Sequence, residues 1–187
     1  MNPIALLPAV FLLLAVSGAQ AGPVVYHSGK PLAATCAAKV TAPDAHSARL
    51  LRLCEAALQE ADLTPATYAA TLTNTGIVKM RRGDFDDALA DFEAARAEPG
   101  ASPDVAINLG AVLVRMNRFD EAVDALSDPQ AISRERRHVA YLNRAIAHWA
   151  LGDVAQAYTD LTVATALKPD YAAAREMLQH FQVADAN

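Results

Sequence analysis

Small and apolar residues recur through the middle of the chain at intervals of 34 or 35 residues. Gly76 and Gly110 are 34 positions apart, and the same interval separates Phe85 from Phe119. Several coincident positions at one interval predict internal repeats, each a supersecondary unit that buries its apolar face against its neighbours. Further pairs at these intervals are Gly83 with Asn117, Ala88 with Ala122, Asn117 with Gly152, and Ala122 with Ala157.

Within each repeat, the pattern predicts two helices joined by a tight turn. Gly83 can take the left-handed conformation that ends a helix, and Asp84 is suited to cap the next one. Gly76 and Gly110 fall in the middle of the first helices, where glycine lowers helix stability, so we expect close helix contact there. The residues expected to fill that contact from the second helices are Phe92, Leu126 and Leu161.

These residues together resemble the tetratricopeptide repeat. The resemblance covers about residues 69–171, as three units at about 69–102, 103–136 and 138–171. It implies an all-α fold, an α-solenoid of three helical hairpins over residues 66–171. The second unit has Pro129 where a small helical residue belongs, so we expect a shortened helix and an irregular link through Ser133.

The flanking segments complete the expected array. Residues 45–62 form an amphipathic pattern with Leu50, Leu53 and Cys54 on one side, which predicts a leading helix that resembles half a repeat. Residues 170–183 predict a C-terminal capping helix. Residues 22–44 are expected to be irregular. Solenoid ends have to hide an apolar face, and these two helices would do so.

The first 21 residues read as a secretory signal peptide. An uncharged apolar run from Ile4 to Val16 is followed by Ala19-Gln20-Ala21, which matches a small-residue cleavage site before Gly22. The alternative is an uncleaved apolar tail or anchor, although the run is short for a membrane span. We therefore expect a periplasmic or secreted protein, cleaved after Ala21, with no membrane insertion afterwards.

Two cysteines, Cys36 and Cys54, follow the leader. An even number of cysteines in an exported protein favours a disulfide. The alternative is a metal site with His27 and His46, but the sequence has no closely spaced ligand pair that would support it. We expect no metal and no cofactor.

Composition and motifs narrow the class of function. The net charge of −5 gives no reason to expect a nucleic acid or an anionic membrane as partner. No nucleophile-elbow, zinc-protease or phosphate-loop pattern is present. An enzyme would need Lys79, His148 and Trp149 to form a site, and nothing in their spacing requires one. We therefore expect a protein without catalytic activity.

Asn74, Asn108 and Asn143 occupy equivalent positions, two residues before Gly76, Gly110 and Ala145. By resemblance, this position faces a concave groove, where an amide can donate to and accept from a peptide backbone. The alternative is that these amides bond within the array. The expected groove residues are Asn74, Ile77, Arg81, Asn108, Ala111, Arg115, Asn143, Ile146 and Trp149.

The expected function is a scaffold or adaptor of the cell envelope that binds a protein or peptide through this groove. The alternative is a structural or oligomerisation module that uses its capping helices or its convex face. The sequence leaves the partner and the oligomeric state open.

Overall fold

The computed structural model describes residues 31–42 and 45–184, and this part of the chain consists of nine α-helices and connecting turns, without a strand. The expected signal peptide, residues 1–21, lies outside the described residues, as does His27. The helices are α1 (Leu32–Val40), α2 (Ala48–Ala57), α3 (Pro65–Arg82), α4 (Phe85–Ala97), α5 (Val105–Arg115), α6 (Phe119–Ala125), α7 (Arg137–Ala150), α8 (Val154–Leu167) and α9 (Ala172–Ala184). The all-α prediction is confirmed.

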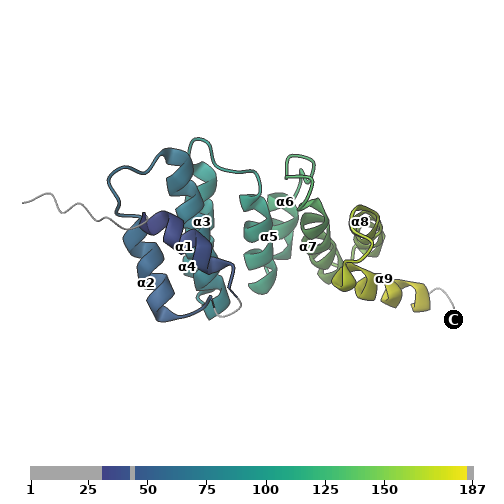
Figure 1. Cartoon of the computed structure of the whole chain (residues 1–187). Coiled ribbons are helices and arrows are strands. Elements are labelled where there is room, and N and C mark those ends of the chain that lie inside the picture. Colours follow the sequence, from purple (N-terminus) through teal and green to yellow (C-terminus); the bar gives the residue numbers. More distant parts are fainter. Residues whose placement is uncertain (1–30, 43–44, 185–187) are drawn as a thin grey trace, which may run out of the picture.

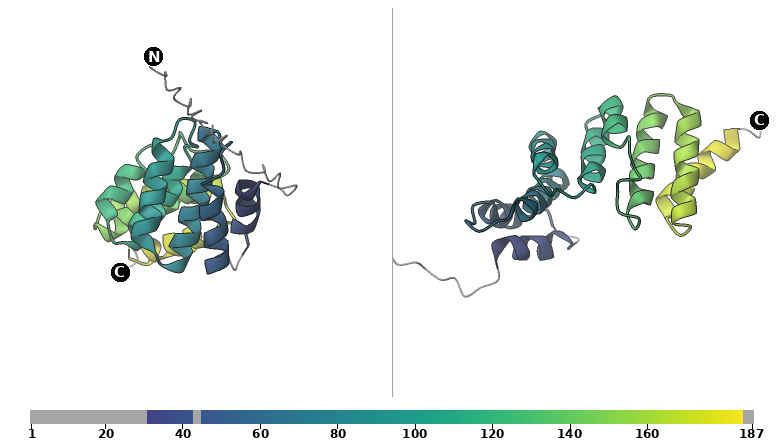
Figure 2. Two further views of the ribbon diagram at one scale, coloured as in Figure 1. Left: turned by 90° about the vertical axis from the view of Figure 1, so that its left-hand side faces the viewer. Right: turned by 90° about the horizontal axis from the view of Figure 1, so that it is seen from above.

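The helices form an elongated, curved row of hairpins (Figures 1 and 2). Helices α3 and α4, α5 and α6, and α7 and α8 pair within the hairpins, and the second helix of each pair also packs against the first helix of the next. Helices α1, α3, α5 and α7 follow one another along one side of the row. We call this side the inner row.

The segment expected to be irregular contains a helix, which corrects that prediction. Helix α1 is rich in alanine, a strong helix former, and Ala33, Cys36 and Val40 bury one face of it. The carboxylate of Glu60 caps its first turn, accepting from the backbone N–H of Leu32 at 2.8 Å and of Ala33 at 3.0 Å. Helix α1 packs against both α2 and α3, so a complete hairpin precedes the three expected ones.

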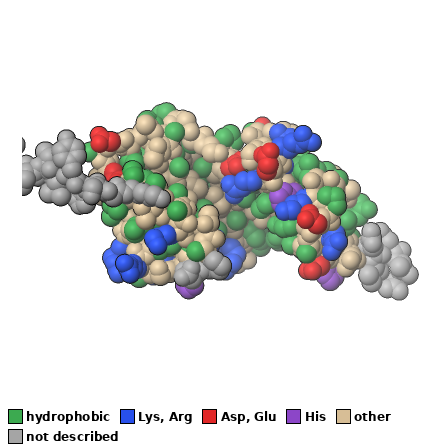
Figure 3. Space-filling view, in the orientation of Figure 1, with side chains coloured by type: hydrophobic (Ala, Val, Ile, Leu, Met, Phe, Trp, Pro, Cys, Tyr) green, Lys and Arg blue, Asp and Glu red, His purple; other side chains and the backbone are tan. Residues whose placement is uncertain are grey.

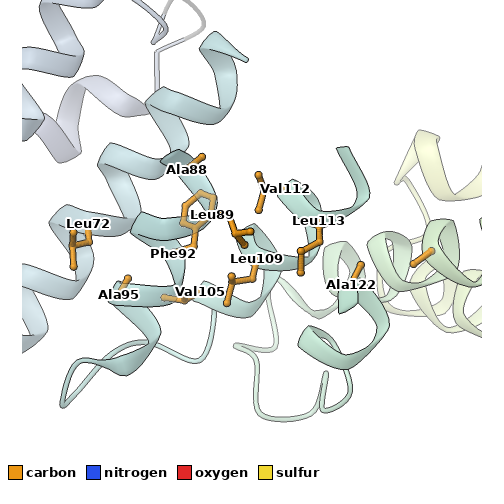
Figure 4. Packing of buried hydrophobic residues seen from close by; sticks show 11 residues of the cluster. Leu72, Ala88, Leu89, Phe92, Ala95, Val105, Leu109, Val112, Leu113 and Ala122 are labelled. Carbon is orange, nitrogen blue, oxygen red and sulfur yellow. The ribbon is translucent and has the colours of Figure 1, made fainter. Parts of the chain in front are cut away.

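Close approach of the paired helices explains the mid-helix glycines. A Cβ atom added to Gly76 would lie 2.6 Å from Cε1 of Phe92, and one added to Gly110 would overlap Leu126. Phe92, Leu126 and Leu161 are all fully buried. Ala145, in the third hairpin, is buried in one cluster with Leu161. In Figure 4, Phe92 lies among buried side chains of α4 and α5. The expected close contact is therefore confirmed.

The turns between paired helices use the expected left-handed residues. Gly83, Asn117 and Gly152 have φ angles of 90°, 58° and 81°, a region open to glycine and tolerated by asparagine. The expected cap is absent in the first hairpin, because the Asp84 carboxylate accepts from Arg82 Nε at 2.9 Å and makes no cap hydrogen bond. Asp153 does cap its helix, accepting from the Gln156 N–H.

The second hairpin is shortened, as Pro129 predicted. Helix α6 has seven residues, and the link that follows is anchored by Ile132, which packs against Ile107, Leu126 and Ala140. Asp104 holds the same link by accepting from the N–H and the hydroxyl of Ser133, at 2.8 and 2.7 Å. The link is thereby fixed against α5 and α7.

The ends of the row are closed differently. At the N-terminal end, Cys36 and Cys54 form a disulfide between α1 and α2, and neither residue is exposed. At the C-terminal end, Ala174 and Phe181 of α9 are buried against the third hairpin, with Met177 and Leu178 partly buried beside them. The expected disulfide and the expected contacts of the capping helix are both present.

The surface carries both signs of charge. On the face shown in Figure 3, basic and acidic side chains are interspersed, with no broad patch of one sign. Within residues 31–42 and 45–184, none of the helices has the length and hydropathy of a membrane span.

Replacing Gly76 with alanine tests the close approach of α3 and α4. We expect Gly76→Ala to lower the free energy of unfolding by about 1 kcal/mol, because overpacking against the buried Phe92 outweighs the gain in helix propensity. Urea denaturation measures the loss. In a Phe92→Leu background, which makes room, the same substitution should be neutral or stabilising. An equal loss in both backgrounds would contradict close contact as the reason for the glycine.

Removing the disulfide tests how the N-terminal hairpin is held. The two cysteines are 18 residues apart, so Cys36→Ala/Cys54→Ala should lower the free energy of unfolding by about 3 kcal/mol through the entropy of the unfolded chain. Urea denaturation with and without reductant measures it. Reductant should destabilise the native chain but leave the double variant unchanged. If reductant changed the free energy of unfolding of both proteins equally, the result would argue against the disulfide.

Candidate functional site

The three repeated asparagines lie on the inner row. Asn74, Asn108 and Asn143 belong to α3, α5 and α7, two residues before the positions that contact the paired helices. Two residues correspond to about 200° around an α-helix. Each asparagine therefore lies on the side of its helix opposite the hairpin partner. This places all three on one side of the row.

Asn143 is engaged within the array. Its Nδ2 donates to the backbone carbonyl of Ile107 on α5 at 3.3 Å, and the residue is half-buried. This bond joins two neighbouring helices of the inner row, α5 and α7, as the alternative interpretation of the asparagines expected. One of the two N–H groups of Nδ2 is therefore engaged within the array.

Asn108 is in a different position. The residue is only 8% exposed, yet its amide has no hydrogen bond among the described residues, and its polar atoms are not sealed from solvent. Helix α5 packs more closely against α7 than against α3, so Asn108 does not repeat the bond that Asn143 makes. Asn108 therefore presents a fixed, unpaired amide on the inner row.

The other expected groove residues of α5 and α7 are one arginine and three apolar residues. Arg115 is exposed, its guanidinium carbon lies 5.2 Å from the centre of the Phe85 ring, and it has no ion pair among the described residues. Ile146 is half-buried against the third hairpin, and Ala111 is half-buried on α5. Trp149 is 48% exposed and meets the Phe181 ring edge-on, with centroids 4.7 Å apart.

The first-hairpin part of the expected groove has a structural role. Arg81 donates through one guanidinium nitrogen to the carbonyls of Val40, at 2.6 Å, and Ala42, at 3.3 Å. Ile77 packs between the core of the first hairpin and the cluster around the disulfide. Arg81 thus holds the C-terminal end of α1, which differs from its expected use as a ligand-binding cation.

Two ion pairs fix the inner row to the outer helices. Lys79 Nζ lies 2.7 Å from the buried Asp91 Oδ2. Burial raises the pKa of Asp91, and the Lys79 charge opposes that rise. Arg144 donates to both oxygens of Asp160 at 2.8 Å, and these bonds raise the pKa of Arg144.

Arg144 also joins the second hairpin to the third. Its remaining guanidinium nitrogen donates to the carbonyls of Leu126 and Ser127, which follow the shortened α6. The repeat spacing alone did not predict this contact. Asp91 and Asp160 stand three residues after the equivalent Ala88 and Ala157, and this repeated acid was the signal that could have indicated the ion pairs.

The residues that an enzyme would have required have separate partners. Lys79 pairs with Asp91 in the first hairpin, whereas His148 Nδ1 lies 3.7 Å from Asp153 and Trp149 contacts Phe181 in the third part of the row. Within the described part of the chain, no group of three or more His, Cys, Asp or Glu side chains could hold a metal ion.

Two shallow cavities lie away from the asparagines. One lies between the end of α1 and the start of α2, and is lined by residues such as Lys39, Arg49 and Leu50. The other lies between the start of α7 and the end of α8, and includes His138 and Lys168. Burial, with the nearby Lys168 charge, lowers the pKa of His138. None of the nine expected groove residues lines either cavity.

Replacing Arg81 distinguishes a structural role from a ligand-binding one. Arg81→Ala should remove the two bonds to α1, lower stability by about 1 kcal/mol and speed amide hydrogen exchange in α1. The control is Arg115→Ala at the equivalent position of the next repeat, which should leave α1 exchange unchanged. If amide exchange in α1 stays the same in Arg81→Ala, the two hydrogen bonds from Arg81 do not stabilise α1.

Comparison with known proteins agrees with the repeat pattern. Residues 79–147 match the family described as tetratricopeptide repeat. No curated protein sequence matches the chain. The matched region runs from α3 into α7, and so contains Asn108, Asn143 and the whole of the second hairpin.

Proposed function

We propose that this chain, a tetratricopeptide repeat protein, binds an extended segment of a partner protein along α5 and α7 of the inner row, without catalysing a reaction. Tetratricopeptide repeats generally mediate protein–protein interaction, which supports a binding role. The observation that carries the location is the nearly buried amide of Asn108, which has no hydrogen bond within residues 31–42 and 45–184.

An asparagine amide suits a peptide backbone because it offers both a donor and an acceptor. Asn108 is held by its surroundings, so binding would order few additional side-chain rotamers. Asn74, which is half-buried on α3, and the acceptor oxygen of Asn143 could extend the contact along the row. Backbone recognition of this kind gives affinity, and side-chain contacts must add specificity.

The flanking side chains suggest what the bound segment carries. Arg115 has no carboxylate partner among the described residues, so a side-chain carboxylate or a chain end could pair with it. Ile146, half-buried on α7, would contact an apolar side chain. Packed helix axes are about 8–10 Å apart, which an extended chain crosses in about three residues. The ligand should therefore have its acid and its apolar residue about three positions apart.

The cell envelope is the proposed location. The buried disulfide between Cys36 and Cys54 is compatible with an oxidising compartment, where such bonds persist. The apolar leader and its cleavage pattern support export. In that compartment, the chain would act as an adaptor that presents a bound segment while its other surfaces remain available.

Peptides selected from a random display library on the native chain provide the test. Asn108→Ala should weaken binding of the selected peptides about fivefold, because one backbone hydrogen bond contributes about 1 kcal/mol. Titration calorimetry measures the affinity. The control is Gln59→Ala, an exposed amide after α2, which should bind as the native chain does.

Circular dichroism should show the same helix content for both variants. If Asn108→Ala binds the selected peptides with unchanged affinity, the segment is not held by the inner row. If peptides with an acid about three positions from an apolar residue are not enriched, the proposed roles of Arg115 and Ile146 are wrong.

A further inference from the structure

The C-terminal end of the row carries a group of exposed apolar side chains. Trp149, Leu151, Val154 and Tyr158 are between 43% and 50% exposed. Val154 and Tyr158 are four residues apart and share one face of α8. The rings of Trp149 and Tyr158 both lie near Phe181, with centroids 4.7 and 6.1 Å away. We call these four residues the end patch, and Figure 3 shows hydrophobic surface at this end of the row.

The end patch is exposed because α9 covers only part of the last hairpin. In a repeat array, each hairpin buries its apolar face against the next one, and the last must be capped. Ala174 and Phe181 of α9 are buried against this hairpin. The outer face of α8 at Val154 and Tyr158 remains open. The described row of helices therefore has, at this end, a surface of the kind that another hairpin would cover.

The opposite end of the same chain does not match this surface. The exposed residues of α2 include Arg49, Arg52 and Glu55, which would be costly to bury against apolar side chains. A head-to-tail arrangement of copies would place these charges on the end patch. A head-to-tail contact of this kind could also repeat from copy to copy and form an open chain of subunits instead of a closed dimer.

We propose that the occupant of the end patch is the end patch of a second copy, so that two chains associate tail to tail about a two-fold axis. Such an isologous contact buries apolar surface on apolar surface and closes after two copies. The exposed charged residues nearest in sequence are of both signs, with Asp153, Arg175 and Glu176 among them. This end is therefore nearly neutral, although the chain carries −5, and two copies can approach it with little repulsion.

The size of the patch sets the expected affinity. Side chains of this size offer about 150–250 Å² when fully exposed, so the four residues present roughly 300–400 Å² of apolar surface. A standard stable interface takes about 800 Å² from each partner, so polar surface around the patch has to contribute as well. The dimer should therefore be weak, with a dissociation constant in the micromolar range.

Val154→Glu tests the contact with little risk to the fold. Val154 is the first residue of α8, where an acidic side chain favours the positive end of the helix. In a two-fold dimer, the substitution brings two carboxylates into an apolar contact. The control is Ala48→Glu, which adds the same charge to an exposed first helical position at the other end of the row.

The protein is expressed from the full sequence. Sedimentation velocity at concentrations of about 2 to 200 µM then measures the formation of the dimer. The native chain and Ala48→Glu should shift from monomer to dimer together, and Val154→Glu should raise the dissociation constant at least tenfold. Tyr158→Ser, which removes an exposed ring without adding charge, should also weaken the dimer.

Three results would overturn the proposal. The native chain could stay monomeric at the highest concentration. Val154→Glu and Tyr158→Ser could dimerise as the native chain does, which would place the contact elsewhere. Species larger than a dimer could grow with concentration, which would show an open head-to-tail contact rather than a closed one.

Discussion

The structure depends on the close approach of the two helices within each hairpin. Small residues at positions 76, 110 and 145 face large buried side chains on the partner helices. A wider spacing between the paired helices would leave those side chains less closely packed and more exposed to water. This contact fixes the rotation of α3, α5 and α7 about their axes. Because the rotation is fixed, the asparagines two residues earlier are all carried to the inner row. A packing constraint thus determines where a polar ligand-binding surface can form.

The differences between repeats then decide what each position does. The full hairpin of α1 and α2 gives Arg81 a backbone to hold, whereas Arg115, its equivalent one repeat later, has no such partner among the described residues. Close packing of α5 on α7 gives Asn143 an acceptor, and looser packing of α3 on α5 leaves Asn108 without one. Equivalent residues therefore divide between those that hold the array and those that have no polar partner among the described residues.

The sequence predicted the features that depend on local or strictly repeated interactions. The helical hairpins, the left-handed turns at Gly83, Asn117 and Gly152, the close contacts at Gly76 and Gly110, and the disulfide followed from spacing and residue type. Helix α1 was missed although Ala33, Cys36 and Val40 have helical spacing, because its flanks carry no family pattern. The roles of Arg81 and Arg144 could not be predicted, since each depends on carbonyls far along the chain that only the packing brings near.

The most direct test of the account is to follow the side-chain amide signals of Asn74, Asn108 and Asn143 by NMR while a selected peptide is added. The account predicts that the Asn108 signals shift and saturate with binding, and that the Asn143 amide, with one N–H already bonded to Ile107, changes less. If all three amides stay unchanged while backbone signals on the outer helices shift, the inner row is not the binding surface and the account is wrong.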